Sequence, residues 1–449
     1  MSPLPPRDAA HLCVRGFSTL GPVKVLVIGT GAREHAIVRA LAADPEVDAV
    51  IAAPGNPGID TVALCEPLPG GLLDGAGIAA LARSHDVDLV VIGPEAPLVA
   101  GAADAVRAAG IPCFGPSAEA ARLEGSKSFA KEVMAAAEVP TALAHVCTTL
   151  EEVEEALDAL GAPHVVKDDG LAAGKGVVVT NDRGAALDHA RTCLDKEGGR
   201  VVIEEFLEGP EVSLFCLCDG KAVLPLAPAQ DFKRVGDHDE GPNTGGMGAY
   251  SPLDWAPASL VDEVVTRIAQ PAVDEMARRG APFVGVLFVG LALTPRGPRV
   301  SEFNARFGDP ETQVVLARLE TPLGGLLAAA ATGRLGQVDA LRWSDQHAVT
   351  VVIASHNYPG TPRTGDPITG LDEVADVPTA YVMHAGTARA ADGTLVSAGG
   401  RVLSVVALGD SLSQARERVY EAVDKVGLEG SHHRTDIALA AERQELHVG

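Results

Sequence analysis

Two lysines and a run of small residues make residues 165–177 the most distinctive chemical stretch of the sequence. The stretch reads VVKDDGLAAGKGV, with Lys167 on an apolar strand and Lys175 in a loop rich in glycine and alanine. Small residues let backbone amides approach phosphate oxygens, and lysine adds a mobile positive charge. It is not a Walker loop, because three residues separate Gly170 from Gly174 and neither Ser nor Thr follows the second lysine. The stretch predicts a phosphate-binding loop.

A carboxylate and an amide two positions apart, Glu302 and Asn304, stand in the stretch VSEFNARFGDPETQ at residues 300–313. On a strand these two side chains point to one side, and Phe303 points to the core. Carboxylate and amide oxygens suit Mg²⁺ that stays partly bound by nucleotide phosphates. The apolar run GVLFVGLAL should lie beside this strand, which disfavours a purely solvated polar face.

Two further polar stretches follow the lysine loop in the sequence, and this position favours a functional interpretation of both. In VIEEFLEGPEVS, residues 202–213, a strand ends in a bend with Glu204 and Glu211 seven positions apart. Main-chain groups there could read an adenine edge and a carboxylate could accept from ribose hydroxyls, although a solvated acidic loop would look similar. The long glycine-rich segment 230–248 is expected to enclose a substrate.

The turn GTGAREH at residues 29–35 follows a strand and opens a helix, where backbone N–H groups can meet an anion. Glu34 occupies the third glycine position of a dinucleotide fingerprint, and no acid ends the next strand, AVIAA. NAD is therefore disfavoured. Phosphate binding and a tight packing turn remain equally good interpretations of these glycines.

The elements that must position these residues fall into three regions. Strands and helices alternate over residues 23–125, which predicts an N-terminal α/β domain with a parallel sheet. Over 126–332, strands expected to pair (164–170 with 176–181, and 200–209 with 212–220) predict an α+β domain with antiparallel sheets. Residues 333–449 are interpreted as a small C-terminal α+β domain.

The bulk properties restrict the possible partners and location. A formal net charge of −24 argues against nucleic acid, and no run of 18 apolar residues could span a membrane. Seven cysteines without metal or disulfide spacing favour a reduced, cytoplasmic protein, and we expect a monomer. Residues 1–22 lack the apolar centre of a signal peptide and are interpreted as a disordered leader or an artefact.

In this order the stretches resemble the ATP-grasp superfamily and, within it, the phosphoribosylamine–glycine ligase family. RFGDPETQ at residues 306–313 fits the family signature RFGDPE-x-Q throughout. The resemblance runs from about residue 23 to 440 and includes GTGAREHA, GPEAPLVAG, FGPS, KDDGLAAGKGV, DEGPNTGGMGAYSP, HAGT, GGRVL and RTDI. It implies a multidomain α/β and α+β fold: a pre-ATP-grasp domain, an ATP-grasp domain of two α+β subdomains with a mobile lid at about 148–213, and a small C-terminal domain.

The resemblance also implies catalytic roles for Arg306, which would stabilise the transferring phosphoryl group or the glycine carboxylate, and for Lys175, in the loop that would close over the phosphates. The ATP phosphates would be held by the lysines and loop glycines Lys127, Lys167, Gly170, Gly174 and Gly176. Adenine and ribose would be held by Glu204, Phe206, Leu207 and Glu211. Mg²⁺ or Mn²⁺ would bind Glu302 and Asn304. Phosphoribosylamine would be surrounded by Gly31, Glu95, Asn243, Gly245, Gly246 and Asp309.

The implied reaction is ATP-dependent ligation of glycine to 5-phosphoribosylamine through glycyl phosphate, giving glycinamide ribonucleotide, ADP and phosphate in purine biosynthesis. The alternatives are a formate- or bicarbonate-using ATP-grasp ligase, an NAD-dependent oxidoreductase, and a non-catalytic nucleotide-binding regulator. Three positions depart from the family pattern without removing an implied ligand. Asp168 stands beside Lys167 where Ala is usual, and Asn357 and Ala438 stand where Gly is frequent.

Overall fold

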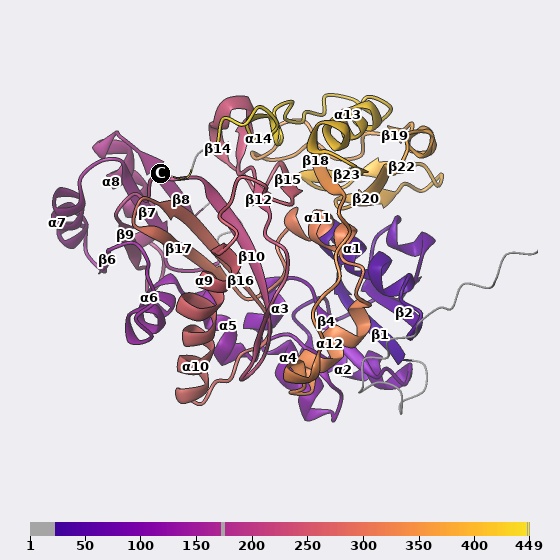
Figure 1. Cartoon of the computed structure of the whole chain (residues 1–449), viewed down its shortest axis with the longest axis horizontal. Helices are drawn as coiled ribbons and strands as arrows, with labels where there is room; N and C mark the ends of the chain where they lie inside the picture. The colour runs from indigo at the N-terminus through magenta and orange to yellow at the C-terminus, as the bar shows by residue number, and fades with distance from the viewer. Residues whose placement is uncertain (1–22, 172–175, 447, 449) are drawn as a thin grey trace, which may run out of the picture.

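The computed structural model describes residues 23–171, 176–446 and 448, and over these residues the N-terminal part is built on a parallel sheet (Figure 1). Its strand order is β3-β2-β1-β4-β5. The strands are β1 (Val23–Gly29), β2 (Val47–Pro54), β3 (Leu64–Cys65), β4 (Leu89–Ile92) and β5 (Cys113–Phe114). The helices are α1 (Ala32–Ala42), α2 (Gly75–Ser84), α3 (Glu95–Val99), α4 (Ala102–Ala108) and α5 (Ala118–Gly125). Alternate residues of β1 enter two different cores, so both faces are covered as predicted.

An antiparallel sheet with its own core forms the left side of Figure 1. Its order is β6-β9-β7-β8, from β6 (Ala144–Cys147), β7 (His164–Asp168), β8 (Val177–Thr180) and β9 (Val201–Glu204). Helices α7 (Leu150–Leu160) and α8 (Arg183–Leu194) cover one face through a small separate cluster that includes Val153, Leu157 and Val166. The other face is free to line a cleft.

A second antiparallel sheet stands opposite, in the order β11-β10-β16-β17. It consists of β10 (Glu211–Asp219), β11 (Val223–Pro225), β16 (Val284–Thr294) and β17 (Gly297–Asn304). The predicted pairing of 200–209 with 212–220 is wrong, because β9 belongs to the first antiparallel sheet and β10 to the second. The segment between them crosses from one sheet to the other, and Gly209 (φ 144°) passes so close to the Leu293 carbonyl that a Cβ would overlap it.

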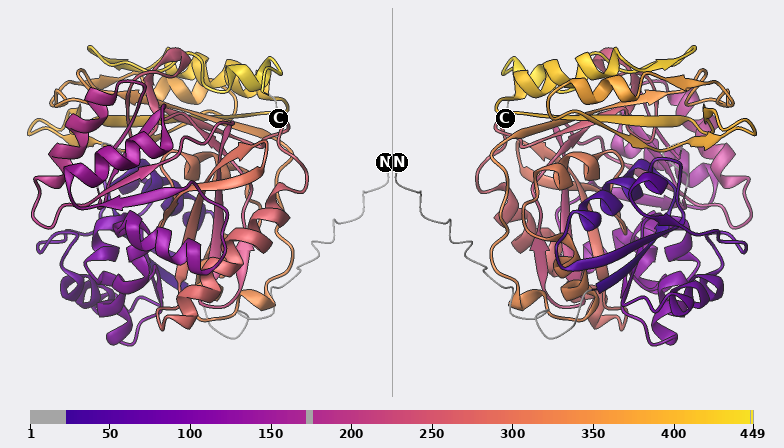
Figure 2. Two further views of the ribbon diagram at one scale, coloured as in Figure 1. Left: turned by 90° about the vertical axis from the view of Figure 1, so that its left-hand side faces the viewer. Right: turned by 90° about the vertical axis from the view of Figure 1, so that its right-hand side faces the viewer.

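The C-terminal sheet has the order β12-β15-β18-β23-β20, and it takes two strands from the middle of the chain. These are β12 (Gln230–Asp231) and β15 (Gly248–Ser251), which precede β18 (His347–Ala354), β20 (Tyr381–His384) and β23 (Arg401–Gly409). Helix α13 (Leu412–Val423) packs on β18 and β23, and α11 (Glu311–Arg318) also contacts this sheet. The C-terminal strands and α13, coloured orange to yellow, form the layer at the top of Figure 2.

The remaining elements are short. Helices α6 (Lys127–Ala136), α9 (Leu260–Val264), α10 (Gln270–Arg278), α12 (Leu323–Ala331) and α14 (Leu439–Glu442) complete the helices, with a π-helical turn at Val265–Ala269. Two short hairpins pair β13 (Arg234–Gly236) with β14 (Glu240–Asn243) and β21 (Thr387–Arg389) with β22 (Leu395–Ser397). A further two-stranded pair joins β19 (Ile368–Thr369) to β24 (Gly427–Leu428), far apart in the chain. No helix among the described residues is long and apolar enough to cross a membrane.

Candidate active site

A cleft of about 900 Å³ lies between the two antiparallel sheets and extends to the N-terminal and C-terminal parts of the molecule. Most residues singled out from the sequence line it: Glu95, Lys127, Lys167, Gly170, Gly176, Glu204, Phe206, Leu207, Glu211, Asn243, Gly245, Glu302, Asn304, Arg306 and Asp309. Gly31 and Gly246 are not among its lining residues. Gly174 and Lys175 lie outside the described residues.

The start of the lysine–glycine loop is fixed to the first turn of α6. Asp169 accepts hydrogen bonds from the backbone N–H (3.0 Å) and hydroxyl (2.6 Å) of Ser128. The Lys127 ammonium donates to the Gly170 carbonyl at 3.0 Å. Burial lowers the pKa of Lys127. The loop therefore leaves the cleft wall beside a largely desolvated ammonium, which suits contact with an anion.

Glu204 lies between two lysines in the wall of the cleft. Its carboxylate is 4% exposed and is 2.9 Å from the Lys167 ammonium and 3.2 Å from that of Lys131. Lys167 also donates to the Ser301 carbonyl at 2.8 Å, so it connects the two sheets. Burial lowers the pKa of Lys131 to about 8. Sequence reasoning missed Lys131, although its position four residues after Lys127 puts both on one face of α6.

Glu302 and Asn304 lie on the same side of β17, and Phe303 is buried on the other, as predicted. Lys233 connects Glu302 to Glu211, which was expected to bind ribose, since its ammonium is 2.7 Å from a Glu211 oxygen and 3.9 Å from a Glu302 oxygen. Burial alone would raise the pKa of Glu302, but nearby ammonium groups, Lys233 first, hold it below its usual range. The carboxylate is thus ionised and available as a ligand.

Arg306 is held by two acids of the N-terminal domain. Its guanidinium is 3.3 Å from Glu95 and 3.0 Å from Glu124, and Glu124 also accepts from the Ala305 backbone N–H at 2.7 Å. Burial would lower the pKa of Arg306, but Glu124 and Glu95 raise it instead. These contacts fix the direction of the guanidinium and leave it a permanent cation.

Two further carboxylates line the cleft near Arg306, and sequence reasoning did not single them out. The Ser213 hydroxyl lies 3.2 Å from Glu311 and 3.4 Å from Asp231. Burial, followed by repulsion from Asp231, raises the pKa of Glu311 to about 8. The pKa of Asp231 is raised as well, so burial and mutual repulsion favour a proton on this carboxyl pair.

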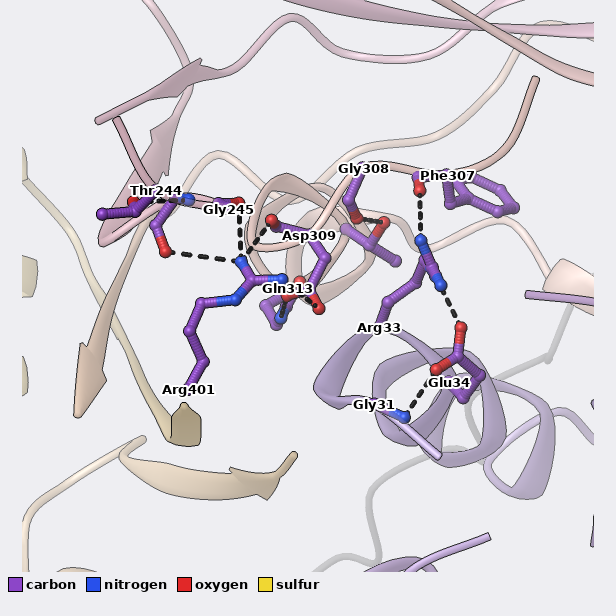
Figure 3. A network of polar contacts seen from close by, with 12 residues as sticks. Gly31, Arg33, Glu34, Thr244, Gly245, Phe307, Gly308, Asp309, Gln313 and Arg401 are labelled. Atoms are coloured by element: carbon purple, nitrogen blue, oxygen red, sulfur yellow. Dashed lines mark hydrogen bonds and ion pairs between the residues drawn. The ribbon is translucent and has the colours of Figure 1, made fainter. Parts of the chain in front are cut away.

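The N-terminal turn is filled by its own glutamate (Figure 3). The Gly31 N–H donates to a Glu34 carboxylate oxygen at 2.6 Å, and a Cβ on Gly29 would lie 2.5 Å from the Glu34 side chain. Arg33 pairs with Glu34 and donates to the Phe307 carbonyl at 3.2 Å. Of the two interpretations of these glycines, packing has direct support, since Glu34 takes the amide that an anion would need.

The three departures from the family pattern have local explanations. Asp168 forms an ion pair with Lys196, just after α8, so its charge is compensated by a partner from the helix-covered side of the sheet. Asn357 and Ala438 have φ values of 72° and 61°, in the left-handed region that favours glycine. The Asn357 side chain also donates to the Thr361 carbonyl at 2.8 Å.

Comparison with known proteins places all three parts of the chain in one family. Residues 23–124 match the phosphoribosylglycinamide synthetase N domain, 125–312 match its ATP-grasp (A) domain, and 348–440 match its C domain. The phosphoribosylamine–glycine ligase of Streptomyces coelicolor is 68% identical over 421 residues, which cover 93% of this chain and 99% of that protein.

Solved structures agree. The crystal structure of phosphoribosylamine–glycine ligase from Thermotoga maritima has a TM-score of 0.79 and 32% identity, and covers 93% of this chain and 100% of that one. The biotin carboxylase domain of Hydrogenobacter thermophilus 2-oxoglutarate carboxylase, solved with MgADP, ADP and bicarbonate, has a TM-score of 0.68 at 16% identity and covers 91% of each chain. At that identity the likeness concerns the fold alone.

Proposed function

The chain belongs to the phosphoribosylamine–glycine ligase family, and we propose that its cleft joins glycine to 5-phosphoribosylamine at the expense of ATP. The products are glycinamide ribonucleotide, ADP and phosphate, a step of purine biosynthesis. One observation carries the assignment: Lys127, Lys167 and Arg306 converge on the same cleft as the oxygen ligands Glu302 and Asn304.

The residues present fit a divalent cation. Glu302 and Asn304 offer two oxygens from one side of a rigid strand, and the depressed pKa of Glu302 keeps its carboxylate ionised. Mg²⁺ accepts such a partial protein shell when nucleotide phosphates complete it, and Mn²⁺ accepts similar ligands. When bound, the cation would neutralise charge on the ATP phosphates.

In the first half of the reaction, the carboxylate of glycine attacks the γ-phosphorus of ATP, so that glycyl phosphate forms and ADP leaves. Because the nucleophile belongs to the substrate, the protein needs only to position the reactants and to neutralise the charge on the phosphates. Lys127 and Lys167 would contact the ATP phosphates, and Arg306, oriented by Glu95 and Glu124, would face the transferring group. Glu204, Phe206, Leu207 and Glu211 would hold adenine and ribose.

In the second half, the amine of phosphoribosylamine attacks the acyl carbon, and the amide forms as phosphate leaves. Acyl phosphates hydrolyse readily, so the site must keep water away from the intermediate. The segment 241–248 would lie over this half, and Asn243 already donates to the Val177 carbonyl of β8 at 3.4 Å. We also propose that the enzyme works as a cytoplasmic monomer with its cysteines reduced.

The test is ADP release by the purified protein with Mg²⁺-ATP, glycine and freshly generated phosphoribosylamine. We expect release to require all three substrates and mass spectrometry to identify glycinamide ribonucleotide. Turnover with formate or bicarbonate in place of glycine would contradict the assignment and indicate another ATP-grasp ligase. Replacing Mg²⁺ by Mn²⁺ in the same assay would establish which metal is preferred.

A further inference from the structure

Arg401, the first residue of β23, contacts two loops that border the cleft (Figure 3). One terminal nitrogen of its guanidinium lies 2.7 Å from the Gly245 carbonyl, 2.6 Å from the Asp309 carbonyl and 3.3 Å from the Gly246 carbonyl. The other is 3.0 Å from the Asp309 carboxylate. Both terminal nitrogens therefore point at protein acceptors, and the side chain holds the loops to each other.

A second side chain from the C-terminal part, Tyr358, also holds the 244–246 loop. Its hydroxyl accepts a hydrogen bond from the Gly245 N–H at 2.9 Å. Gly400 allows this approach, because a Cβ at that position would overlap the Tyr358 ring. Arg401 thus takes the carbonyl of Gly245, and Tyr358 takes its amide.

The 244–246 loop packs so closely against its neighbours that its two glycines leave little room for a side chain. A Cβ on Gly245 would lie 3.0 Å from Cζ of Arg401. Gly246 has φ 113°, and a Cβ there would overlap the Pro310 ring. Thr244 accepts the Gly246 N–H at 2.9 Å, so the main polar groups of this loop are committed to one conformation.

The same contacts extend to the N-terminal domain through the 307–309 segment. Asp309 accepts from Gln313 at 2.8 Å on its other oxygen, and the Phe307 carbonyl accepts from Arg33 of α1. Arg401 therefore stands at the point where segments from all three parts of the chain meet. Arg401, Tyr358, Gly245 and Asp309 all line the cleft.

We propose that Arg401 and Tyr358 are positioning residues for phosphoribosylamine, which act by holding the 244–246 and 307–309 loops in the substrate-receiving conformation. The inference rests on the function proposed above. Glycine-rich loops lose much conformational entropy when they are ordered, and a guanidinium that fixes several carbonyls removes that cost before the substrate arrives. The proposed ATP contacts come from α6, β7, β9, β10, β17 and the segment between β9 and β10. Among the described residues, neither side chain has a hydrogen bond or ion pair to these elements.

The experiment measures KM for each substrate and kcat in Arg401→Gln, Arg401→Lys and Tyr358→Phe. For Arg401→Gln we expect KM for phosphoribosylamine to rise about tenfold, since charge-assisted hydrogen bonds to several acceptors are lost. KM for ATP and for glycine should change by less than about twofold. Arg401→Lys should recover part of the loss, and Tyr358→Phe should raise the same KM about threefold.

Arg389→Gln is the matched control, because Arg389 lies in the same part of the chain and donates only within its own β21–β22 turn, to Gly393. Its KM values should equal those of the unchanged protein. A parallel rise of KM for ATP in Arg401→Gln, or an unchanged KM for phosphoribosylamine in both Arg401→Gln and Tyr358→Phe, would overturn the inference. If the unchanged protein forms no glycinamide ribonucleotide, the proposed function itself fails, and the inference fails with it.

Should Arg401→Gln fail to fold, Tyr358→Phe decides the question, since it removes one hydroxyl and keeps the ring against Gly400. A variant that merely destabilises the whole fold would show a lower kcat or a lower Tm, while the KM values for the three substrates would keep the same proportions as in the unchanged protein. The proposal requires the substrate-selective change in KM.

Discussion

In the half of the cleft that we propose binds the nucleotide, called the nucleotide half below, charged side chains on helices and strands face one another. Lys127, Lys131, Lys167, Glu204 and Glu302 form this half, and their backbones belong to α6, β7, β9 and β17. The half that we propose for phosphoribosylamine consists instead of the loops 244–246 and 307–309. Arg401 joins them through backbone carbonyls, and Arg33 of α1 donates to the Phe307 carbonyl (Figure 3).

The difference shows two ways to prepare a binding site. Regular elements carry the charges of the first half, so its backbone does not depend on the side chains that meet the ligand. In the second half the proposed site is formed mainly by loop backbone. The conformation of that backbone depends on side chains far away in the chain and on glycines, which have no Cβ. We expect the first half to be sensitive to loss of charge and the second to added volume.

The largest effect should follow from removing a charge in the nucleotide half. Glu302→Ala should lower the rate of ADP release by about a hundredfold or more, because it removes the one carboxylate of the proposed metal site. Secondary structure and Tm should stay close to those of the unchanged protein. Initial rates and circular dichroism measure both.

Glu417→Ala is the control for that variant, since Glu417 is an exposed carboxylate on α13. Full activity in Glu302→Ala would contradict the assignment of the metal site and remove the distinction between the two halves.

A smaller effect should follow from adding one methyl group to the second half. Gly245→Ala places a Cβ about 3 Å from the Arg401 guanidinium and should raise KM for phosphoribosylamine about three- to tenfold. Gly336→Ala is the matched control, because no atom lies within 4 Å of a Cβ there. If Gly245→Ala raised KM for ATP instead, the loop would belong to the nucleotide half.

The protonated carboxyl between the halves predicts a pH dependence of stability. The pKa of Glu311 is raised to about 8 by burial, so its contribution to stability is full below pH 4.5 and is lost as pH rises towards about 8. Glu311→Gln removes the titration. The Tm of this variant, relative to the unchanged protein, should therefore increase by a few degrees between pH 5 and pH 8. A constant difference across that range would show that Glu311 is ionised in the folded protein.

The smallest effect concerns the helix that carries two lysines of the nucleotide half. At the end of α6, Val139 N–H bonds to Met134 and Glu138 N–H to Ala135, with Glu138 at φ 54°. Glycine is favoured at this position, so Glu138→Gly should raise the free energy of unfolding by about 0.5–1 kcal/mol without changing KM. Ala135→Gly, inside the same helix, should lower it by about 1 kcal/mol. Chemical denaturation measures both.

Most residues that the sequence singled out for the nucleotide and the metal line one cleft, and they could be found because they stand in contiguous stretches with strong periodicity. Glycine spacing draws attention to the loop with Lys167 and Lys175, and strand alternation draws attention to the Glu302–Asn304 pair. The proposed role of Lys127 rests on the family resemblance. Lys131 was within reach of the same reasoning, since it is one helical turn from Lys127. The parallel and antiparallel sheets followed from apolar runs and turn residues.

The phosphoribosylamine half could not be predicted in the same way, because its contacts join residues far apart in the chain. Nothing in the segment around Arg401 indicates that its partners are Gly245 and Asp309, 156 and 92 positions away. The separation of β9 from β10 into different sheets was missed for a similar reason. A short Gly-Pro connection looks the same whether the chain turns back or crosses a cleft.

The strands β12 and β15 have a consequence for folding. They come from the middle of the chain: β15 pairs with β18, with Gly248 opposite Val351, and β12 pairs with β15, so the C-terminal sheet is incomplete without residues 230–251. A fragment that begins at residue 348 would expose β18 as a long apolar edge, which invites intermolecular pairing and aggregation. We therefore expect the middle and C-terminal parts to melt in one cooperative transition, with matching hydrogen-exchange protection on both sides of that strand pair.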